Sequence, residues 1–230
     1  MRIDRFLSNL NYGSRNDIKK YIKEKRVKIN NTLCTNSSTS INENIDKVYF
    51  DNELVFYLEN ICIAFNKPQN YICSNIDELY PSILNLLPEE IVRLGLNICG
   101  RLDADTEGLV ILTSNGNYVH QIISPSKNVY KKYLVHTKNK IENINLFENG
   151  LEILDGRSNL YTSEKAELNL LEDTKCIVSI KEGKFHQVKR MFEAIDNEVV
   201  YLKRLSVGNY NMPDDLLLGE YKIISIDEII

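Results

Sequence analysis

The stretch GRLDADTEGLVILTSNG occupies residues 100–116 and joins a charged segment to a strand pattern. Its first ten residues hold three carboxylates, one arginine and two glycines, and the strand-like run Val110–Thr113 follows them. Functional groups often sit on loops next to rigid strands, so the segment is a candidate site. An acidic loop is also common as a solvated turn, and these residues alone do not decide between the two interpretations.

Two further segments support the interpretation as a site. The segment EGKFHQVKRMF at residues 182–192 predicts a turn at Gly183 and then a helix that carries several basic residues. Its apolar residues follow helical spacing and should be buried on one side: Val188, Met191 and Phe192. The other side can direct a cation at an acidic loop. The segment KKYLV at residues 131–135 places Tyr133 at the start of a predicted strand.

The N-terminus predicts a small basic module. Apolar residues at helical spacing favour a first helix: Ile3, Phe6, Leu7 and Leu10. Ser14 and Asp17 have the spacing of a capping box for a second helix, and Asn30-Asn31 predicts a hairpin turn. Residues 1–30 contain nine basic and three acidic residues (net +6), whereas the rest holds nineteen basic and twenty-nine acidic residues (net −10). A basic head on an acidic body predicts a local binding patch for an anion.

The remaining pattern predicts many short strands and few helices. Predicted strands are Ile61–Phe65, stopped by Asn66-Lys67-Pro68, then Tyr71–Ser74, Gly108–Thr113, Tyr133–Thr137, Ala166–Leu171, Cys176–Ile180, Val199–Leu205 and Tyr221–Ile226. Predicted helices lie near Ser82–Leu87, Asn117–Ile123, Ile141–Glu148 and His186–Ile195. This order is typical of an α+β fold with a mainly antiparallel sheet. We expect two domains, 1–59 and 60–230.

Composition narrows the function class. Five cysteines without a C-x-x-C pair and three histidines give no metal-ligand spacing, so we expect buried or free thiols in a reducing cytoplasm and no metal. No apolar run approaches the ~18–20 residues of a membrane span. Charged residues in the first turn disfavour a signal peptide. We therefore expect a cytoplasmic protein, without a membrane partner.

The three segments, in this order, resemble the motifs of bacterial rRNA pseudouridine synthases. Residues 100–116 resemble the defining family motif, residues 131–135 its tyrosine motif, and residues 182–192 the basic helix of the ribosomal small subunit pseudouridine synthase A type. Residues 2–30, RIDRFLSNLNYGSRNDIKKYIKEKRVKIN, resemble the alpha-L RNA-binding module shared with a small-subunit ribosomal protein. The resemblance covers almost the whole chain and implies a pseudouridine synthase catalytic domain behind an RNA-binding module.

The resemblance implies roles for matching residues. Asp103 would be the catalytic aspartate, Tyr133 the active-site tyrosine and Lys189 the cation that pairs with Asp103. Arg101 would help to hold the flipped nucleotide, and the neighbouring Arg190 could share the pairing. His186 and Gln187 are further candidate substrate-binding residues, although a structural hydrogen bond is the other interpretation for His186. Candidate RNA contacts of the module are Arg2, Arg5, Arg15, Lys19, Lys20, Lys23, Arg26 and Lys28.

The implied reaction breaks the N-glycosidic bond of uridine and rejoins the uracil to the same sugar through carbon, which calls for no cofactor. It needs an ionised carboxylate beside the anomeric carbon, as a nucleophile or as a base toward a sugar proton. A cation a few ångströms away keeps such a carboxylate charged. The uridine must also leave the RNA stack, at a cost of a few kcal/mol.

Other interpretations stay open from the sequence. Asp103 and Asp105 could form a hydrolytic pair, although their spacing on one loop favours a loop-shaping role for Asp105. The substrate could be large-subunit instead of small-subunit rRNA. The protein could also be an assembly factor that binds rRNA without catalysis. We expect ribosomal RNA or the assembling small subunit as partner and a monomeric enzyme.

Overall fold

The structure, a computed structural model, describes residues 1–230 apart from the side chain of Pro125. It divides into two compact units: Met1–Ile61 with Leu87–Leu96, and Cys62–Leu86 with Asn97–Ile230. The first unit is therefore discontinuous, whereas from the sequence we expect a single boundary after residue 59. Within this unit the Arg93 guanidinium lies 4.4 Å from the centre of the Tyr12 ring, and Arg93 O accepts a hydrogen bond from Asn11 Nδ2. Local patterns do not reveal contacts between residues so far apart in the chain.

The first unit combines three helices with a small antiparallel sheet in the order β2-β1-β3-β4. Its elements are α1 (Ile3–Asn9), α2 (Arg15–Lys23), β1 (Val27–Ile29), β2 (Thr32–Leu33), β3 (Val48–Phe50), β4 (Glu53–Leu54) and α3 (Glu89–Val92). The predicted capping box is confirmed: Asp17 N donates to Ser14 Oγ, and Ser14 N donates to Asp17 Oδ2. Asn30 takes a left-handed conformation, φ 53°, in the β1–β2 turn, as the Asn-Asn pair predicts.

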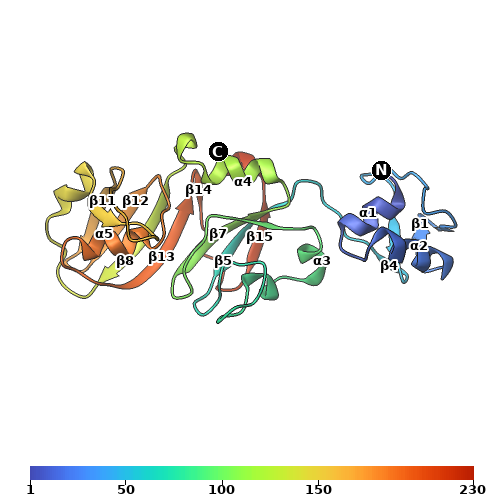
Figure 1. The fold of residues 1–230 in the computed structure, drawn as a ribbon, viewed down its shortest axis with the longest axis horizontal. Helices are drawn as coiled ribbons and strands as arrows, with labels where there is room; N and C mark the ends of the chain where they lie inside the picture. The colour runs from blue at the N-terminus through green and yellow to red at the C-terminus, as the bar shows by residue number, and fades with distance from the viewer. The chain divides into compact units, whose positions relative to one another are not determined.

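The second unit is built on a nine-stranded sheet in the order β11-β12-β8-β13-β7-β5-β15, with β14 paired to β13 and β6 to β7. The strands are β5 (Cys62–Lys67), β6 (Asn97–Cys99), β7 (Glu107–Thr113), β8 (Lys131–Thr137), β11 (Glu167–Glu172), β12 (Lys175–Ile180), β13 (Val199–Val207), β14 (Tyr210–Asn211) and β15 (Tyr221–Ile224). The long β13 runs through the middle of this sheet (Figure 1). The expected α+β class with a mainly antiparallel mixed sheet is confirmed.

The parallel pairing of β13 with β7 is the exception in this sheet, and it lies beside the acidic segment. Lys203 is opposite Glu107, and Arg204 is opposite Gly108. Gly108 has φ 105°, and a Cβ on it would lie 2.2 Å from the carbonyl oxygen of Arg204. A glycine is therefore required for β7 to approach β13 this closely.

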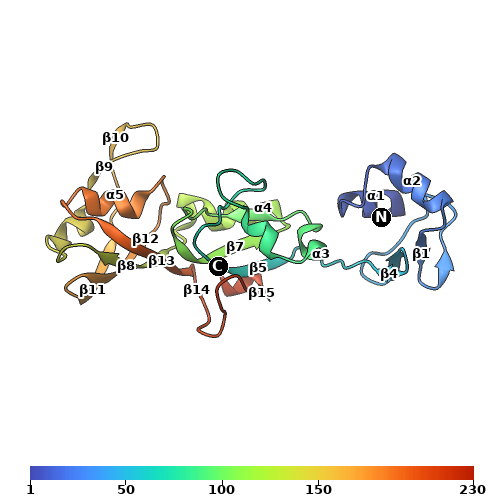
Figure 2. The same ribbon diagram turned by 90° about the horizontal axis from the view of Figure 1, so that it is seen from below.

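Helices and one hairpin cover the sheet. They are α4 (Gly116–Ile123), α5 (Gln187–Glu193), the 3-10 turns Ile83–Leu86, Pro125–Lys127, Ile144–Asn149 and Ile226–Glu228, and the hairpin of β9 (Glu152–Leu154) with β10 (Leu160–Thr162). The α4 residue Ile122 packs in a buried cluster with Leu109 and Ile111 of β7. The three predicted apolar residues of α5 are buried, and Phe192 contacts Phe147 with ring centres 5.2 Å apart. Figure 2 shows α5 between the sheet and the β9–β10 hairpin.

Several predicted elements are wrong in kind or extent. Residues 71–74 form no strand; Ile72 makes only an isolated bridge to Ser82. The predicted helices at 82–87 and 141–148 are short 3-10 turns, the second preceded by Asn143 in a left-handed conformation. β5 continues through Lys67, because Pro68 lacks a donor only at its own position. Within the part of the chain that the structure describes, no helix is both long and apolar enough to cross a membrane.

Candidate active site

Asp103 lies on a loop, residues 100–106, that leads directly into β7; we call it the acidic loop. Lys67, at the end of β5, is fully buried beneath it. Its Nζ donates to the carbonyl oxygens of Ala104 at 3.4 Å and Thr106 at 2.8 Å. Thr106 N in turn donates to Asp103 O at 3.1 Å. These bonds fix the backbone that follows Asp103, so the position of its carboxylate is well defined.

Lys189 of α5 is the cation that faces this loop. Its Nζ lies 3.1 Å from Asp103 Oδ2 and donates to both oxygens of Asp105, at 2.7 and 2.9 Å. Burial by itself lowers the pKa of Lys189, but the hydrogen bond to Asp105 and the charge of Asp103 raise it above its usual value. Burial by itself raises the pKa of Asp105, but the hydrogen bond and charge of Lys189 hold it below its usual value. Asp105 therefore shares the ammonium, which corrects the expectation that it only shapes the loop.

His186 occupies the other side of the same carboxylate. Its Nε2 lies 3.3 Å from Asp103 Oδ1, and its ring stacks on Phe185 with ring centres 3.8 Å apart. The residue has φ 53°, a left-handed conformation that is uncommon for residues other than glycine. The geometry thus favours a role at Asp103 over a structural hydrogen bond elsewhere.

Two neighbouring strands supply the wall of a pocket next to Asp103. Tyr133 on β8 is directly opposite Arg204 on β13, and Leu202 lies two residues away on the same face. These residues line a pocket of about 260 Å³ together with Asp103 and Lys189. Pockets for small ligands typically measure ~300–1,000 Å³, so this one suits a single nucleoside better than a larger molecule.

Several residues that line this pocket were not among the predicted site residues, including Lys131, Leu202 and Arg204. A signal was present, because strand alternation places Arg204 on the same face as the apolar Leu202, where a charge is unusual. Lys131 is buried and donates from Nζ to Lys181 O at 2.8 Å. Burial, with the positive charge of Arg204, lowers the pKa of Lys131 to about 8.

Of the other predicted site residues, Arg101 lies at the pocket surface, whereas Arg190 and Gln187 are bonded within the protein. Arg101 is exposed and lines the pocket. Arg190 does not pair with Asp103: its guanidinium donates to Leu154 O and lies over the Phe185 ring, which corrects the alternative that it shares the ion pair. Gln187 is buried, and both ends of its side chain bond within the protein, to Lys184 N and to Glu182 Oε1. Its amide holds the turn before α5, so we do not retain it as a direct substrate ligand.

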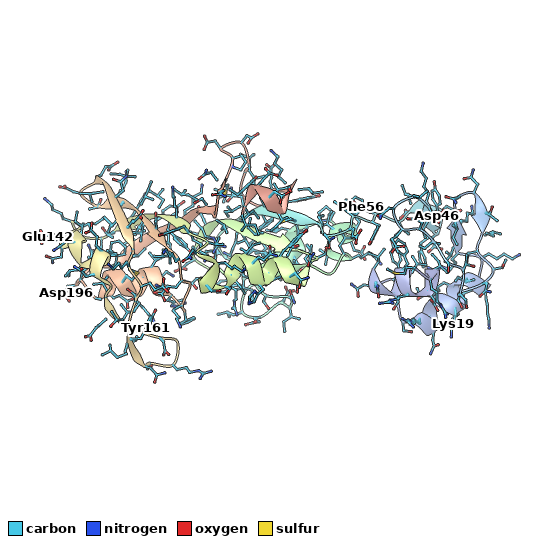
Figure 3. The ribbon with its side chains drawn as sticks, turned by 90° about the horizontal axis from the view of Figure 1, so that it is seen from above. Lys19, Asp46, Phe56, Glu142, Tyr161 and Asp196 are labelled. Atoms are coloured by element: carbon cyan, nitrogen blue, oxygen red, sulfur yellow. The ribbon has the colours of Figure 1, made fainter. Side chains whose placement is uncertain are left out.

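The basic residues of the first unit differ in whether their charge is already paired within the protein. Arg26 binds Asp51 through two hydrogen bonds and lies over the rings of Tyr21 and Phe50. Arg2 pairs with Asp4 and Lys28 donates to Asn52, so these charges are partly neutralised or engaged. Of the eight predicted RNA contacts, five are exposed and make no ion pair among the described residues: Arg5, Arg15, Lys19, Lys20 and Lys23. Figure 3 shows the Lys19 side chain on the surface of its unit.

The cysteines give no sign of reactivity. All five are free and buried, as expected. Burial raises the pKa of Cys99, which precedes the acidic loop, to about 12. A thiol must ionise to act as a nucleophile or metal ligand. In the described part of the chain, no group of three or more His, Cys, Asp or Glu residues could hold a metal ion.

Comparisons with known proteins point to one family. The RNA pseudouridylate synthase model matches residues 61–194, and the S4 domain model matches residues 1–44. Ribosomal small subunit pseudouridine synthase A of Haemophilus influenzae is 36% identical over 100% of this chain and 98% of its own. An uncharacterised RNA pseudouridine synthase of Bacillus subtilis is also 36% identical, over 100% of this chain and 97% of its own. A crystal structure of a pseudouridylate synthase shares 33% identity over the whole of both chains, with a TM-score of 0.69. The chain therefore belongs to the RNA pseudouridylate synthase family and carries an S4 domain at its N-terminus.

Proposed function

We propose that the chain converts a uridine of small-subunit ribosomal RNA to pseudouridine, with Asp103 as the catalytic carboxylate. The observation that carries this proposal is the placement of Asp103 beside the pocket, with Lys189 at 3.1 Å from one oxygen and His186 at 3.3 Å from the other. The choice of small-subunit RNA is supported by the relatives that bear the name ribosomal small subunit pseudouridine synthase A, at 32–36% identity over the whole chain.

The reaction breaks the bond between uracil N1 and the sugar C1′ and forms a bond between C5 and C1′. The hydrogen of C5 leaves as a proton and N1 gains one, so no redox step is involved. The carboxylate acts as a nucleophile at C1′ or as a base toward a neighbouring sugar proton. Both routes need a negatively charged Asp103, and the ammonium of Lys189 stabilises that charge in a partly buried site.

The other groups position the substrate. The Tyr133 ring provides a flat wall for the uracil, and its hydroxyl is available for proton transfer. Arg101, exposed at the pocket, holds the flipped nucleotide away from its stack, and His186 contacts it from the side of α5. The unpaired cations of the S4 domain bind phosphates, which gives affinity that weakens with salt. We place this activity in the cytoplasm, in a monomer that acts on rRNA or on the assembling small subunit.

The test maps modification directly. Purified protein is incubated with small-subunit rRNA, its precursor particle or large-subunit rRNA, and carbodiimide-induced reverse-transcription stops are mapped. We expect one new stop in small-subunit RNA with the wild-type protein and with Asp196→Asn, and none with Asp103→Asn. Asp196 is an exposed carboxylate with φ 57°, a conformation that asparagine tolerates, and is therefore a matched control (Figure 3).

Each other outcome contradicts a specific part of the proposal. A stop confined to large-subunit RNA would transfer the substrate to that subunit. A stop that persists in Asp103→Asn would refute the catalytic role of Asp103. Absence of a new stop in every RNA, together with binding, would leave only an assembly factor that binds rRNA.

A further inference from the structure

Arg204 is a buried cation at the back of the pocket, with only 2% of its surface exposed. Its Nε donates to Leu109 O at 2.6 Å and its Nη2 to Gly100 O at 2.9 Å. Its Nη1 lies 3.5 Å from the hydroxyl oxygen of Tyr133. It makes no ion pair with any residue that the structure describes, so its charge is balanced only by carbonyl and hydroxyl dipoles. A buried charge that lacks a carboxylate partner is costly and calls for a reason.

The fold directs this side chain at Tyr133. The two residues are opposite each other in the antiparallel β8–β13 pair, where facing Cβ atoms lie about 4.5–5.5 Å apart. The contacts with Gly100 and Leu109 bracket the acidic loop, so the guanidinium is held by the same segment that carries Asp103. Arg204 therefore connects the strand of the tyrosine to the loop of the catalytic carboxylate.

The hydrogen-bonding chemistry of the two groups is asymmetric. A guanidinium carries five N–H donors and no acceptor, whereas a phenol can donate one hydrogen bond and accept others. Tyr133 Oη must therefore accept from Arg204, and its own hydrogen must point elsewhere. Among the described residues, none accepts a hydrogen bond from this hydroxyl. The open direction is the pocket, which Tyr133 and Arg204 both line.

We propose that Arg204 is a positioning residue that fixes Tyr133 as a hydrogen-bond donor toward the uracil. This inference rests on the proposed function, which places the uracil against Tyr133. A uracil detached from C1′ carries negative charge shared between N1 and its carbonyl oxygens, and a donor aimed at it stabilises that charge. The positive charge of Arg204 also acts on the pocket. Burial and this charge together lower the pKa of Lys131, another residue that lines the pocket, to about 8.

A double-mutant cycle tests the proposal through Tyr133. The rate of the chemical step is measured under single-turnover conditions, as release of tritium from RNA labelled at uridine C5, for the wild type, Arg204→Gln, Tyr133→Phe and the double variant. A hydrogen bond from a charged group to a reacting group corresponds to about 10- to 100-fold in rate. We expect Arg204→Gln to cost this factor in the wild-type background and at most about threefold in the Tyr133→Phe background.

Controls separate position from folding. Lys203→Gln changes the neighbouring cation, on the opposite face of β13, and should keep the wild-type rate. If Arg204→Gln does not fold, as judged by thermal melting, Arg204→Lys replaces it in the cycle, with a smaller loss in the same pattern. If Tyr133→Phe turns over too slowly to measure, the same cycle is run on RNA affinity in an Asp103→Asn background. There the Tyr133 hydroxyl can still donate to a carbonyl oxygen of the intact uracil, so a smaller coupling between the two sites is expected.

The outcomes are distinguishable. Equal losses from the Arg204 substitution in both backgrounds would overturn the inference and leave Arg204 as a support for the loop alone. Full activity of Tyr133→Phe would contradict the proposed function of the tyrosine itself. Loss of coupling with retained sensitivity to Tyr133→Phe would refute only the positioning role.

Discussion

Replacement of Lys189 by methionine removes the one ammonium that two carboxylates share. Methionine matches the length of the apolar stem of lysine and lacks only its ammonium group, so packing on α5 should change little. Asp103 and Asp105, two residues apart on the acidic loop, would then lack the cation that lies 3.1 Å from Asp103 and 2.7 Å from Asp105. His186 remains at 3.3 Å from Asp103 and retains part of the stabilisation.

The magnitude follows from the exposure of the pair. Two unit charges 4 Å apart attract by about 4 kcal/mol at the effective dielectric constant of ~20 that suits protein sites. The Lys189 side chain is 18% exposed and that of Asp103 28%, so solvent screens part of this attraction. A hydrogen bond to a charged group contributes about 1.5–3 kcal/mol net. Because 1.4 kcal/mol is a factor of ten, the chemical step should slow roughly 10- to 100-fold.

The assay is single-turnover tritium release from C5-labelled small-subunit rRNA, with RNA affinity measured in parallel. Lys189→Arg should recover most of the rate, since a guanidinium can also bridge the two carboxylates. Arg190→Met is the matched control on the next residue, and it should stay within about threefold of wild type because Arg190 contacts Leu154 O instead of Asp103. A folded Lys189→Met protein that reacts at the wild-type rate would refute the electrostatic argument, as would a loss confined to RNA affinity.

Two more predictions concern the surface of the S4 domain and the buried lysine of the pocket. Replacing the unpaired Lys19, Lys20 and Lys23 by glutamine should weaken RNA binding and reduce the slope of log affinity against log salt by about 2–3, the change expected for three lost phosphate contacts. Arg26 already binds Asp51, so Arg26→Gln should reduce the slope by less than the loss of one phosphate contact does. The assignment would be contradicted if the triple variant and Arg26→Gln had the same slope. The pKa of Lys131 is about 8 in the folded protein, against an ordinary value of 10.5. Between pH 8 and 10.5 the unfolded chain therefore binds more protons than the folded protein. The contribution of Lys131 to the free energy of unfolding consequently rises with pH in this range. The melting temperature of the wild type should therefore gain on that of Lys131→Met from pH 8 to 10.5, and a constant difference would contradict the shift.

Local patterns were sufficient for much of the fold. Apolar runs and turn residues predicted the strands around Val110 and Ile177, and the Ser14 capping box predicted where α2 begins. These features depend on residues close in the chain. The predicted strand at 71–74 and helix at 141–148 failed because their backbones are held by distant partners, as in the bond from Ile83 N to Ile72 O and that from Ile141 N to Asp173 O.

The sequence by itself determined the chemistry available to this protein: an acidic loop before a buried strand, a tyrosine at a strand start, a basic helix and a cationic N-terminal module. Only the tertiary structure decided which of these groups meet. It selected Lys189 over Arg190 as the partner of Asp103, gave Asp105 a share of the ammonium, and placed Arg204 behind Tyr133. The physical reason is that neighbouring residues on a short helix or strand point in different directions, so their contacts depend on how the elements pack against one another.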